Sequence, residues 1–217
     1  PRQAKRTVPS AFATGAVRHR LIAGFRSRNR LTEYGGTSFL VSQSQPIFGE
    51  ADSIPEQSFA FGPVNEGRVK QSSLMLGYTG RVSGVATINL GLQKVRYRAA
   101  TTAGRTGLVT RSRDDPWLYN ASLGIALSPA LSLYAATQTG LEDSGFAPEN
   151  ATNSNALLPA TRATQYEGGL RWKIHSGQLA INAFQITKPY FTFDSADFYA
   201  EQGTIRNRGL ELSFSGH

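Results

Sequence analysis

The residues best suited to chemistry are the basic side chains of one short stretch near the start of the chain: Arg18, Arg20, Arg26, Arg28 and Arg30. Clustered guanidinium groups bind phosphates and other anions, so a nucleic-acid interface is one interpretation. Here, however, the arginines alternate with Val17, Leu21 and Phe25. This spacing predicts a strand with one basic and one apolar face. We therefore expect an arginine row that attracts anionic ligands, with Arg26 and Arg28 as candidate contacts, and no binding of nucleic acid.

A second candidate is an aromatic segment near the end of the chain. It contains Tyr190, Phe191, Phe193 and Tyr199 within a predicted long connection spanning 188–202. Aromatic faces together with arginines suit a flat metal chelate, and loops commonly carry binding residues. The alternative is that these aromatic residues extend two strands and pack on neighbouring loops.

No catalytic residue or metal ligand is predicted. The chain contains no Cys and only three His, and it shows no phosphate-binding glycine loop, HExxH motif or GxSxG motif. Acidic pairs such as Asp114 and Asp115 lie in predicted loops without EF-hand spacing, so we interpret them as solvated loop acids.

The elements that must position these residues are indicated by a period of two in side-chain polarity. It is clearest over 119–127 and 164–174, where apolar and small polar residues alternate. The same alternation, sometimes weaker, covers 17–28, 69–79, 85–97, 131–140, 179–188 and 209–215. Within 179–188, Phe184 and Ile186 fall out of phase, which indicates either a bulge or a protein contact on that face. The sequence therefore predicts eight strands, with a possible ninth over 37–45.

Short and long connections alternate between these strands. Tight turns are predicted at 80–84, 128–130 and 175–177, and long polar connections at 27–67, 99–116, 141–162 and 188–202. An antiparallel up-and-down sheet with all tight turns at one rim explains this pattern. It is the arrangement of an outer-membrane β-barrel, whose strands of about 10 residues alternate apolar-out and polar-in.

Composition agrees with a membrane barrel. Only 18% of the 217 residues are charged, while 22 are Gly, and the net charge is +8. The most apolar stretch, 124–141, is interrupted at Pro129, so no membrane helix is expected. Aromatic residues near strand ends suit interfacial girdles: Tyr78, Trp117, Tyr119, Trp172 and Phe214. A soluble β-rich binding module remains the alternative, although its solvent face would normally carry more Lys and Glu.

Four segments in the second half resemble the barrel of TonB-dependent outer-membrane receptors, of the siderophore-receptor type. They are LSLYAA at 131–136, QYEGGLR at 165–171, AFQITKP at 183–189 and RNRGLELSFSG at 206–216. Segment 15–25 resembles an earlier strand of the same barrel. The resemblance implies an all-β, antiparallel, up-and-down transmembrane barrel, of which this chain supplies about 8–10 of a probable 22 strands.

This resemblance also implies a function and partners. The expected function is TonB-dependent uptake of a ferric siderophore, or a similar scarce nutrient, across the bacterial outer membrane, with no enzymatic activity and no covalently bound cofactor. Residues 1–217 would be a segment of the barrel wall, surrounded by outer-membrane lipid. The plug domain, the closing strands and the N-terminal part that contacts the TonB complex would lie outside it. A small autonomous outer-membrane protein of eight to ten strands is the other alternative.

Three charged residues are expected to face the lumen or the plug: Glu167, Arg171 and Glu211. Glu167 and Arg171 lie four residues apart on one polar row, and Glu211 interrupts an apolar stretch. Glu211 would need a partner such as Arg171. The alternative is that all three are wall charges that only keep the lumen hydrated.

Overall fold

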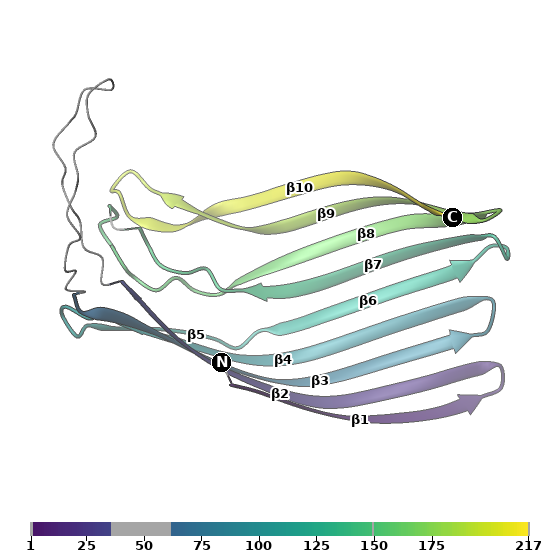
Figure 1. Cartoon of the computed structure of the whole chain (residues 1–217), viewed down its shortest axis with the longest axis horizontal. Helices are drawn as coiled ribbons and strands as arrows, with labels where there is room; N and C mark the ends of the chain where they lie inside the picture. The colour runs from purple at the N-terminus through teal and green to yellow at the C-terminus, as the bar shows by residue number, and fades with distance from the viewer. Residues whose placement is uncertain (1, 36–61, 149, 217) are drawn as a thin grey trace, which may run out of the picture.

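The computed structural model describes residues 2–35, 62–148 and 150–216, which form ten strands in one antiparallel sheet (Figure 1). The strands are β1 (Arg2–Thr14), β2 (Val17–Gly35), β3 (Val64–Val82), β4 (Ala86–Thr102), β5 (Val109–Asp114), β6 (Trp117–Ala126), β7 (Leu131–Glu142), β8 (Thr161–Ile174), β9 (Gly177–Phe193) and β10 (Tyr199–Gly216). No helix of the described residues is long and apolar enough to cross a membrane.

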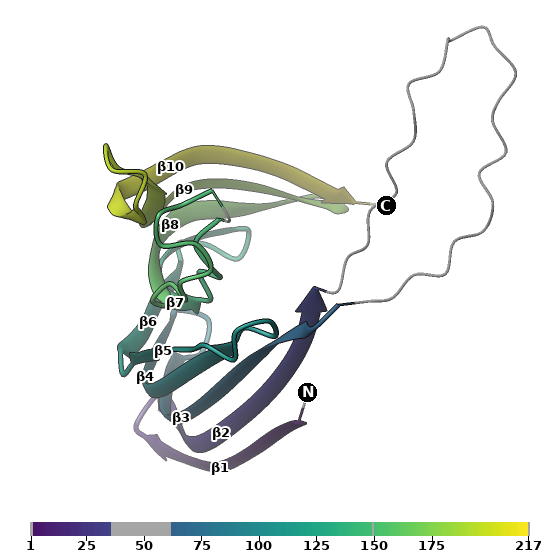
Figure 2. The ribbon, with the colours of Figure 1, turned by 90° about the vertical axis from the view of Figure 1, so that its left-hand side faces the viewer.

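Each strand pairs with its neighbours in the sequence, in the order β1-β2-β3-β4-β6-β7-β8-β9-β10, and the short β5 pairs with β4. The sheet curves into an arc with β1 and β10 at its two edges and does not close (Figure 2). Tight connections lie at one rim, and the turn residues Gly15, Gly84 and His175 have positive φ angles of 60°, 72° and 45°. The all-β, up-and-down architecture expected from the sequence is therefore confirmed.

The strands are longer than the alternation predicts. β2 continues to Gly35, and β9 and β10 leave only 194–198 between them, so much of the predicted connections 27–67 and 188–202 is strand. β1 and β5 were not predicted. In these regions both faces carry polar residues, so the period of two is weak although backbone pairing continues. The possible strand over 37–45 lies outside the described residues.

The register gives the convex face an apolar belt. Directly paired residues of an antiparallel sheet share a face, and Leu76 pairs with both Ala23 and Leu92. This face exposes Leu210 to 81% and Leu212 to 72%. The expected girdle residues Trp117 and Trp172 lie on it, and the full set of exposed belt residues includes Leu21, Phe25, Leu74, Leu90, Leu123, Ile125, Leu133, Tyr166, Ile181 and Phe214. Such a surface suits lipid and not water.

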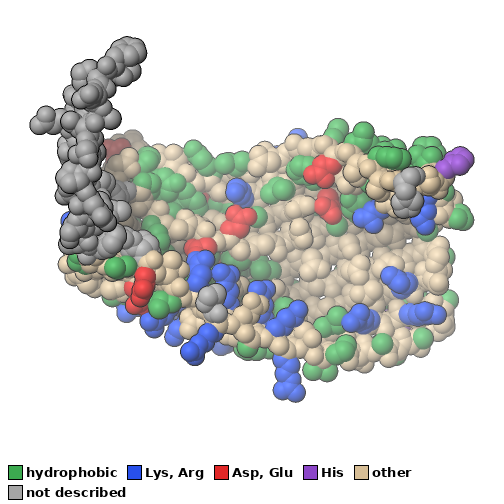
Figure 3. Space-filling model, in the orientation of Figure 1, with side chains coloured by type: hydrophobic (Ala, Val, Ile, Leu, Met, Phe, Trp, Pro, Cys, Tyr) green, Lys and Arg blue, Asp and Glu red, His purple; other side chains and the backbone are tan. Residues whose placement is uncertain are grey.

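The concave face, which is turned toward the viewer in Figure 3, is polar. Hydrogen bonds cross it from strand to strand: Thr79 Oγ1 donates to Asn89 Oδ1 at 2.9 Å, and Asn89 Nδ2 donates to Ser122 Oγ at 3.1 Å. These small side chains satisfy one another on a wall that must stay hydrated. The concave face therefore corresponds to a barrel lumen.

The out-of-phase residues Phe184 and Ile186 lie on the concave face. Pairing between β8 and β9 is continuous. The irregularity in the β9–β10 ladder lies nearer the long-loop rim, between Glu201 and Gly203. A bulge at 184–186 is therefore excluded. The ring of Phe184 covers Gly209, where an added Cβ would come within 2.6 Å of a ring carbon.

Segment 143–160, between β7 and β8, folds over the concave face near the long-loop rim. Beneath it lies a buried cluster of Val69, Val95, Tyr97, Ala99, Leu118 and Ala160. A second buried cluster, formed by Ala147, Ala151 and Leu158, packs against Phe191, Phe193 and Tyr199. Asn153 ties the segment to β10, since its side chain donates to the Tyr199 carbonyl and accepts from the Tyr199 N–H, both at 2.9 Å.

We predict that Leu90→Arg destabilises the full-length protein by about 2–4 kcal/mol, because Leu90 lies in the middle of the belt and a charge there faces hydrocarbon. Gln93→Arg, three residues away on the concave face, is the matched control and should change the free energy of unfolding by under about 0.5 kcal/mol. Unfolding from vesicles measures both. Equal destabilisation by the two variants would contradict the assignment of the faces.

We also predict that Asn153→Ala releases segment 143–160 from β10. The variant loses two hydrogen bonds, and each contributes about 0.5–1.5 kcal/mol. Cleavage within 143–160 by a nonspecific protease added to whole cells should become several-fold faster. Thr152→Ala is the control, because the Thr152 side chain makes no contact of this kind with the described residues. Cleavage of both variants at the rate of the unmodified protein would show that Asn153 does not hold the segment.

Candidate ligand-binding face

The arginine row lies on the concave face of β2. Arg26 pairs with Ser73, Arg28 with Gln71 and Arg30 with Val69, whereas Phe25 pairs with Leu74 on the convex face. In total, seven basic residues of β1–β3 share the concave face: Lys5, Arg18, Arg20, Arg26, Arg28, Arg30 and Arg81. Within the described parts of β1–β4, no Asp or Glu occupies this face.

Within the described residues, most of these cations have no charged partner. Arg30 Nη2 forms an ion pair with Asp143 Oδ2 at 2.7 Å, which brings segment 143–160 over β2. With its amide oxygen turned toward β2, Gln3 accepts from Arg26 Nε at 3.0 Å. Arg20 and Arg28 form no ion pair with any residue that the structure describes. The row therefore retains positive charge for a ligand.

Three acidic residues of the concave face lie on the opposite limb of the arc, whereas Asp114 of β5 is level with the concave residue Tyr97 of β4. Glu142, Glu167 and Glu211 are on β7, β8 and β10. Glu142 is the only one of the three in an ion pair within the described residues, with Lys188 at 3.8 Å. In Figure 3, Lys and Arg side chains correspondingly gather in the lower half of the view, over β1–β4. On that limb Arg171, Lys173 and Lys188 share the concave face with these three carboxylates. The concave wall is therefore basic over β1–β3 and close to neutral on the other limb.

Glu167, Arg171 and Glu211 all lie on the concave face, but they do not pair as expected. Glu167 Oε2 accepts from Gln165 Nε2 at 2.8 Å. Arg171 lies over the ring of Tyr134, with its guanidinium carbon 5.1 Å from the ring centroid. The expected partnership of Arg171 with Glu211 is not among the ion pairs of the described residues.

The register explains why Arg171 and Glu211 do not pair. Glu211 is level with Asn182, whose Oδ1 accepts from the Tyr134 hydroxyl at 2.8 Å, whereas Arg171 lies one row away, level with Ala180. Tyr134 therefore occupies the space between the two charges, and its ring offers Arg171 a cation–π contact instead.

The aromatic candidates are strand residues. Tyr190, Phe191 and Phe193 belong to β9, and Tyr199 begins β10. The rings of Phe193 and Tyr199 meet edge to face, with centroids 5.1 Å apart, and both pack against segment 143–160. Tyr190 is 43% exposed. Phe191, Phe193 and Tyr199 thus extend strands and pack on a neighbouring loop, which was the alternative to ligand binding. Tyr190 is the most accessible of the four aromatic residues.

The structure does not bring the aromatic group and the arginine row into contact. Arg26 and Arg28 lie on β2, and five strands of the main path separate β2 from β9. The two groups lie on opposite limbs of the arc (Figure 2). Between them, a hollow of about 170 Å³ on the concave face is lined by polar residues that include Asn120, Gln138 and Glu167.

Asp143, Tyr97 and Lys188 contribute to this face but were not singled out from the sequence. Asp143 belongs to a segment interpreted as a solvated loop, and its contact with Arg30 spans 113 residues. Tyr97 and Lys188 continue the alternation of β4 and β9 beyond the apolar belt, and that continuation is the only signal that could have revealed them. No group of three His, Asp or Glu among the described residues is placed to hold a metal ion.

Several solved receptors have the same fold. The ferric-catecholate import receptor Fiu from E. coli K12 matches with a TM-score of 0.79 at 15% identity, over 99% of this chain and 35% of its own. BauA, the ferric preacinetobactin receptor from Acinetobacter baumannii, matches with a TM-score of 0.74 at 23% identity, and the match covers 99% of this chain and 34% of BauA. The ferripyoverdine receptor of Pseudomonas aeruginosa matches with a TM-score of 0.74 at 17% identity, and the match covers 99% of this chain and 30% of that receptor chain. This chain thus spans about a third of the length of each.

No curated protein sequence matches the chain significantly. A family model described as "TonB dependent receptor-like, beta-barrel" matches residues 4–217, which is nearly the whole chain. This match covers the described strands of both limbs, including the first half, where the sequence motifs were weakest. The chain therefore belongs to the TonB-dependent receptor β-barrel family.

Proposed function

We propose that this chain is part of the barrel wall of an outer-membrane receptor that imports a negatively charged ferric siderophore in a TonB-dependent manner. The observation that carries the proposal is the arginine row on the concave face of β2, most of which has no ionic partner in the part of the chain that the structure describes. Unpaired cations lining a confined polar cavity concentrate anions there. Iron(III) bound by three catecholate dianions carries a charge of about −3, which suits such a wall.

In the proposed receptor, a plug domain outside these 217 residues fills the lumen, and the TonB complex supplies the energy for transport. The concave residues Glu167, Arg171 and Glu211 would face that plug or the water around it. Arg26, Arg28 and Tyr190 are the proposed ligand contacts, because they are the candidates with accessible groups on or near the lumen. Phe191, Phe193 and Tyr199 would act indirectly, by holding segment 143–160 in place. No catalytic step is proposed.

Family membership favours this proposal over a soluble β-rich module and over a small autonomous outer-membrane protein. The named ligands of the similar receptors, which include a ferric catecholate and ferripyoverdine, support iron chelates as the substrate class. A different scarce nutrient, such as cobalamin or a glycan, is the competing substrate class.

Deleting the whole gene should abolish growth on iron-limited medium supplied with an anionic ferric tris-catecholate as the sole iron source. Growth on a freely available iron salt should be unaffected. Plasmid-borne wild-type gene should restore growth. Unchanged iron uptake combined with impaired uptake of cobalamin or a glycan would overturn the siderophore assignment.

We predict that Arg26→Gln/Arg28→Gln in the complete receptor weakens binding of a ferric tris-catecholate by about 30-fold. Each charge within about 4 Å of the chelate contributes about 1 kcal/mol even at the dielectric constant of water, or a factor of about five. The control variant Arg26→Lys/Arg28→Lys keeps both charges and should lose much less. Binding measured by quenching of intrinsic fluorescence tests this, with a neutral ferric trihydroxamate as the second ligand. An unchanged affinity for the anionic chelate would remove these arginines from the site.

A further inference from the structure

The arginine row meets one anion of the chain itself at its long-loop end. Asp143 follows directly after β7, and its Oδ2 accepts from Arg30 Nη2 at 2.7 Å, across 113 residues of sequence. Arg30 lies two residues from Arg28 along β2 and shares its concave face. The ion pair remains open to solvent, since the Arg30 side chain is 39% exposed and that of Asp143 is 35% exposed. A carboxylate therefore lies where an anionic ligand entering from outside would meet the row.

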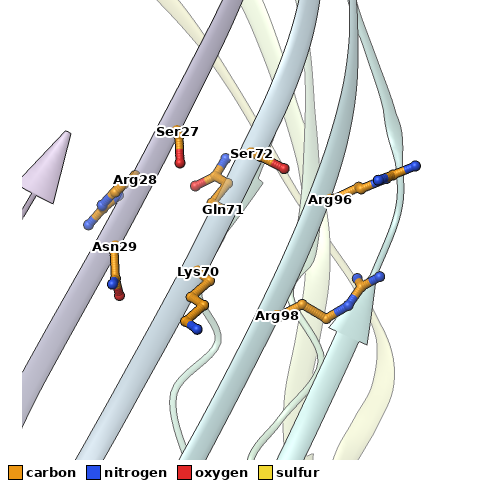
Figure 4. A pocket seen from close by; sticks show the side chains of 8 residues that line it. All are labelled: Ser27, Arg28, Asn29, Lys70, Gln71, Ser72, Arg96 and Arg98. Atoms are coloured by element: carbon orange, nitrogen blue, oxygen red, sulfur yellow. The ribbon is translucent and has the colours of Figure 1, made fainter. Parts of the chain in front are cut away.

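Arg28 and Tyr97 lie beside this ion pair. Arg28 is level with Gln71, and Gln71 is level with Tyr97, all on the concave face. Figure 4 shows Arg28 and Gln71 on the neighbouring strands β2 and β3, together with Arg96 of β4, which the register places on the convex face. The concave side chains of this row thus form one polar group, separate from the cations of the convex face.

The Tyr97 hydroxyl is a hydrogen-bond donor to the same carboxylate. Burial, followed by the negative charge of Asp143 and the hydrogen bond with it, raises the pKa of Tyr97 to about 12. The positive charges of Arg30 and Arg28 act on this hydroxyl in the opposite direction, so both guanidinium groups lie near it. The hydroxyl keeps its proton at neutral pH. Tyr97, Arg30 and Arg28 therefore direct donors toward one place, which Asp143 occupies.

Asp143 uses only part of this donor capacity. The Nε of Arg30 is buried and has no hydrogen-bond partner among the described residues, which is unfavourable for a charged donor. Arg28 likewise forms no ion pair within the part of the chain that the structure describes. A larger anion with several oxygen atoms could accept from both arginines and from Tyr97, so it would satisfy the group better than one carboxylate does.

Asp143 can leave Arg30 while the rest of its segment stays in place. Exposed ion pairs of this kind are weak. Gly145, two residues further on, has a positive φ of 73°, and its N–H donates to Asp143 Oδ1 at 3.3 Å. Residues 147–158 are held separately, by their own buried cluster against β9 and β10 and by the hydrogen bonds of Asn153. Only the start of the segment must therefore move.

We propose, as an extension that rests on the proposed function, that Arg30, Arg28 and the Tyr97 hydroxyl form a subsite for the oxygen atoms of an anionic ferric chelate, and that Asp143 occupies this subsite until the chelate displaces it. Because Asp143 is tethered, its carboxylate competes at a high effective concentration. An anion that reaches Arg30 alone competes poorly, whereas a chelate that also contacts the rest of the row displaces the carboxylate. Asp143 thus determines specificity for anions of several charges without contacting the bound chelate.

The test compares binding of a ferric tris-catecholate by variants of the complete receptor, measured by quenching of intrinsic fluorescence. Asp143→Asn keeps the shape of the side chain and removes its charge, so it should bind the chelate about five-fold more tightly, the factor for one charge pair about 4 Å apart in water. Its affinity for a neutral ferric trihydroxamate should equal that of the wild type.

Asp114→Asn is the matched control. Asp114 lies on the concave face level with Tyr97, but it belongs to β5, three strands from Arg30, and forms no ion pair with the described residues. Because solvent ions screen charges at such a separation, this variant should change the affinity for the tris-catecholate by less than about two-fold. Equal affinities of Asp143→Asn and Asp114→Asn would overturn the inference.

Arg30→Gln separates competition from simple charge repulsion. In the Asp143→Asn background it should weaken binding of the tris-catecholate about five-fold. In the otherwise unmodified receptor its effect should be distinctly smaller, because the loss of Arg30 there also releases the competing carboxylate. The same loss of affinity in both backgrounds would show that Asp143 does not compete for Arg30.

Hydrogen–deuterium exchange of the complete receptor reports the displacement itself. Backbone amides of residues 143–145 should exchange several-fold faster when the tris-catecholate is bound, whereas those of 147–158 should not change. Slower or unchanged exchange at 143–145 would contradict displacement. If the wild type binds no ferric chelate, the proposed function fails and this inference fails with it. If the wild type binds the chelate without these effects, only this inference fails.

Discussion

The structure depends on one constraint, which is that backbone N–H and C=O groups have no water to bond with inside a bilayer. Every strand must therefore pair along its whole membrane-spanning length, and the β2–β3 ladder runs without a break from Val17 to Gly35. Since side chains alternate between faces, a slip of one residue would turn the arginine row toward lipid and Leu21 and Phe25 toward the lumen. The same pairing that satisfies the backbone thus also assigns each side chain to lipid or to water.

Beyond the apolar belt, on the long-loop side, side chains still alternate between the concave and the convex face, but the convex face there no longer meets hydrocarbon. The strands extend past the membrane, and both of their faces there carry polar residues. Arg28 and Arg96 lie at similar heights, yet one faces the lumen and the other faces outward. Their chemistry is the same and their surroundings differ: a confined polar cavity on one side, and on the other a surface that continues into the apolar belt. Net charge alone could not separate the two sets of cations, because together they appear only as part of the overall +8.

Segment 143–160 connects the two limbs of the arc at the long-loop rim. Its Asp143 pairs with Arg30 of β2, while Asn153 and the small residues around Ala147 dock on β9 and β10. The aromatic residues that resemble a ligand platform in the sequence mostly form the base of this contact. Burial of Phe191 and Phe193 there stabilises the segment, and the accessible polar groups of the wall are left to meet a ligand.

The sequence by itself determined the strands of the membrane belt, their tight turns, and the concave placement of Arg26, Arg28, Glu167, Arg171 and Glu211, because a period of two is local and survives in any register that hides apolar residues from water. It also carried the family motifs. Only the tertiary structure decided the rest. β1 and β5 lack a one-sided pattern, Arg171 turns to Tyr134 because Glu211 lies in the next row, and Arg30 meets Asp143 across 113 residues. Such contacts depend on the curvature of the sheet, which brings distant strands together and leaves no periodic trace in the chain.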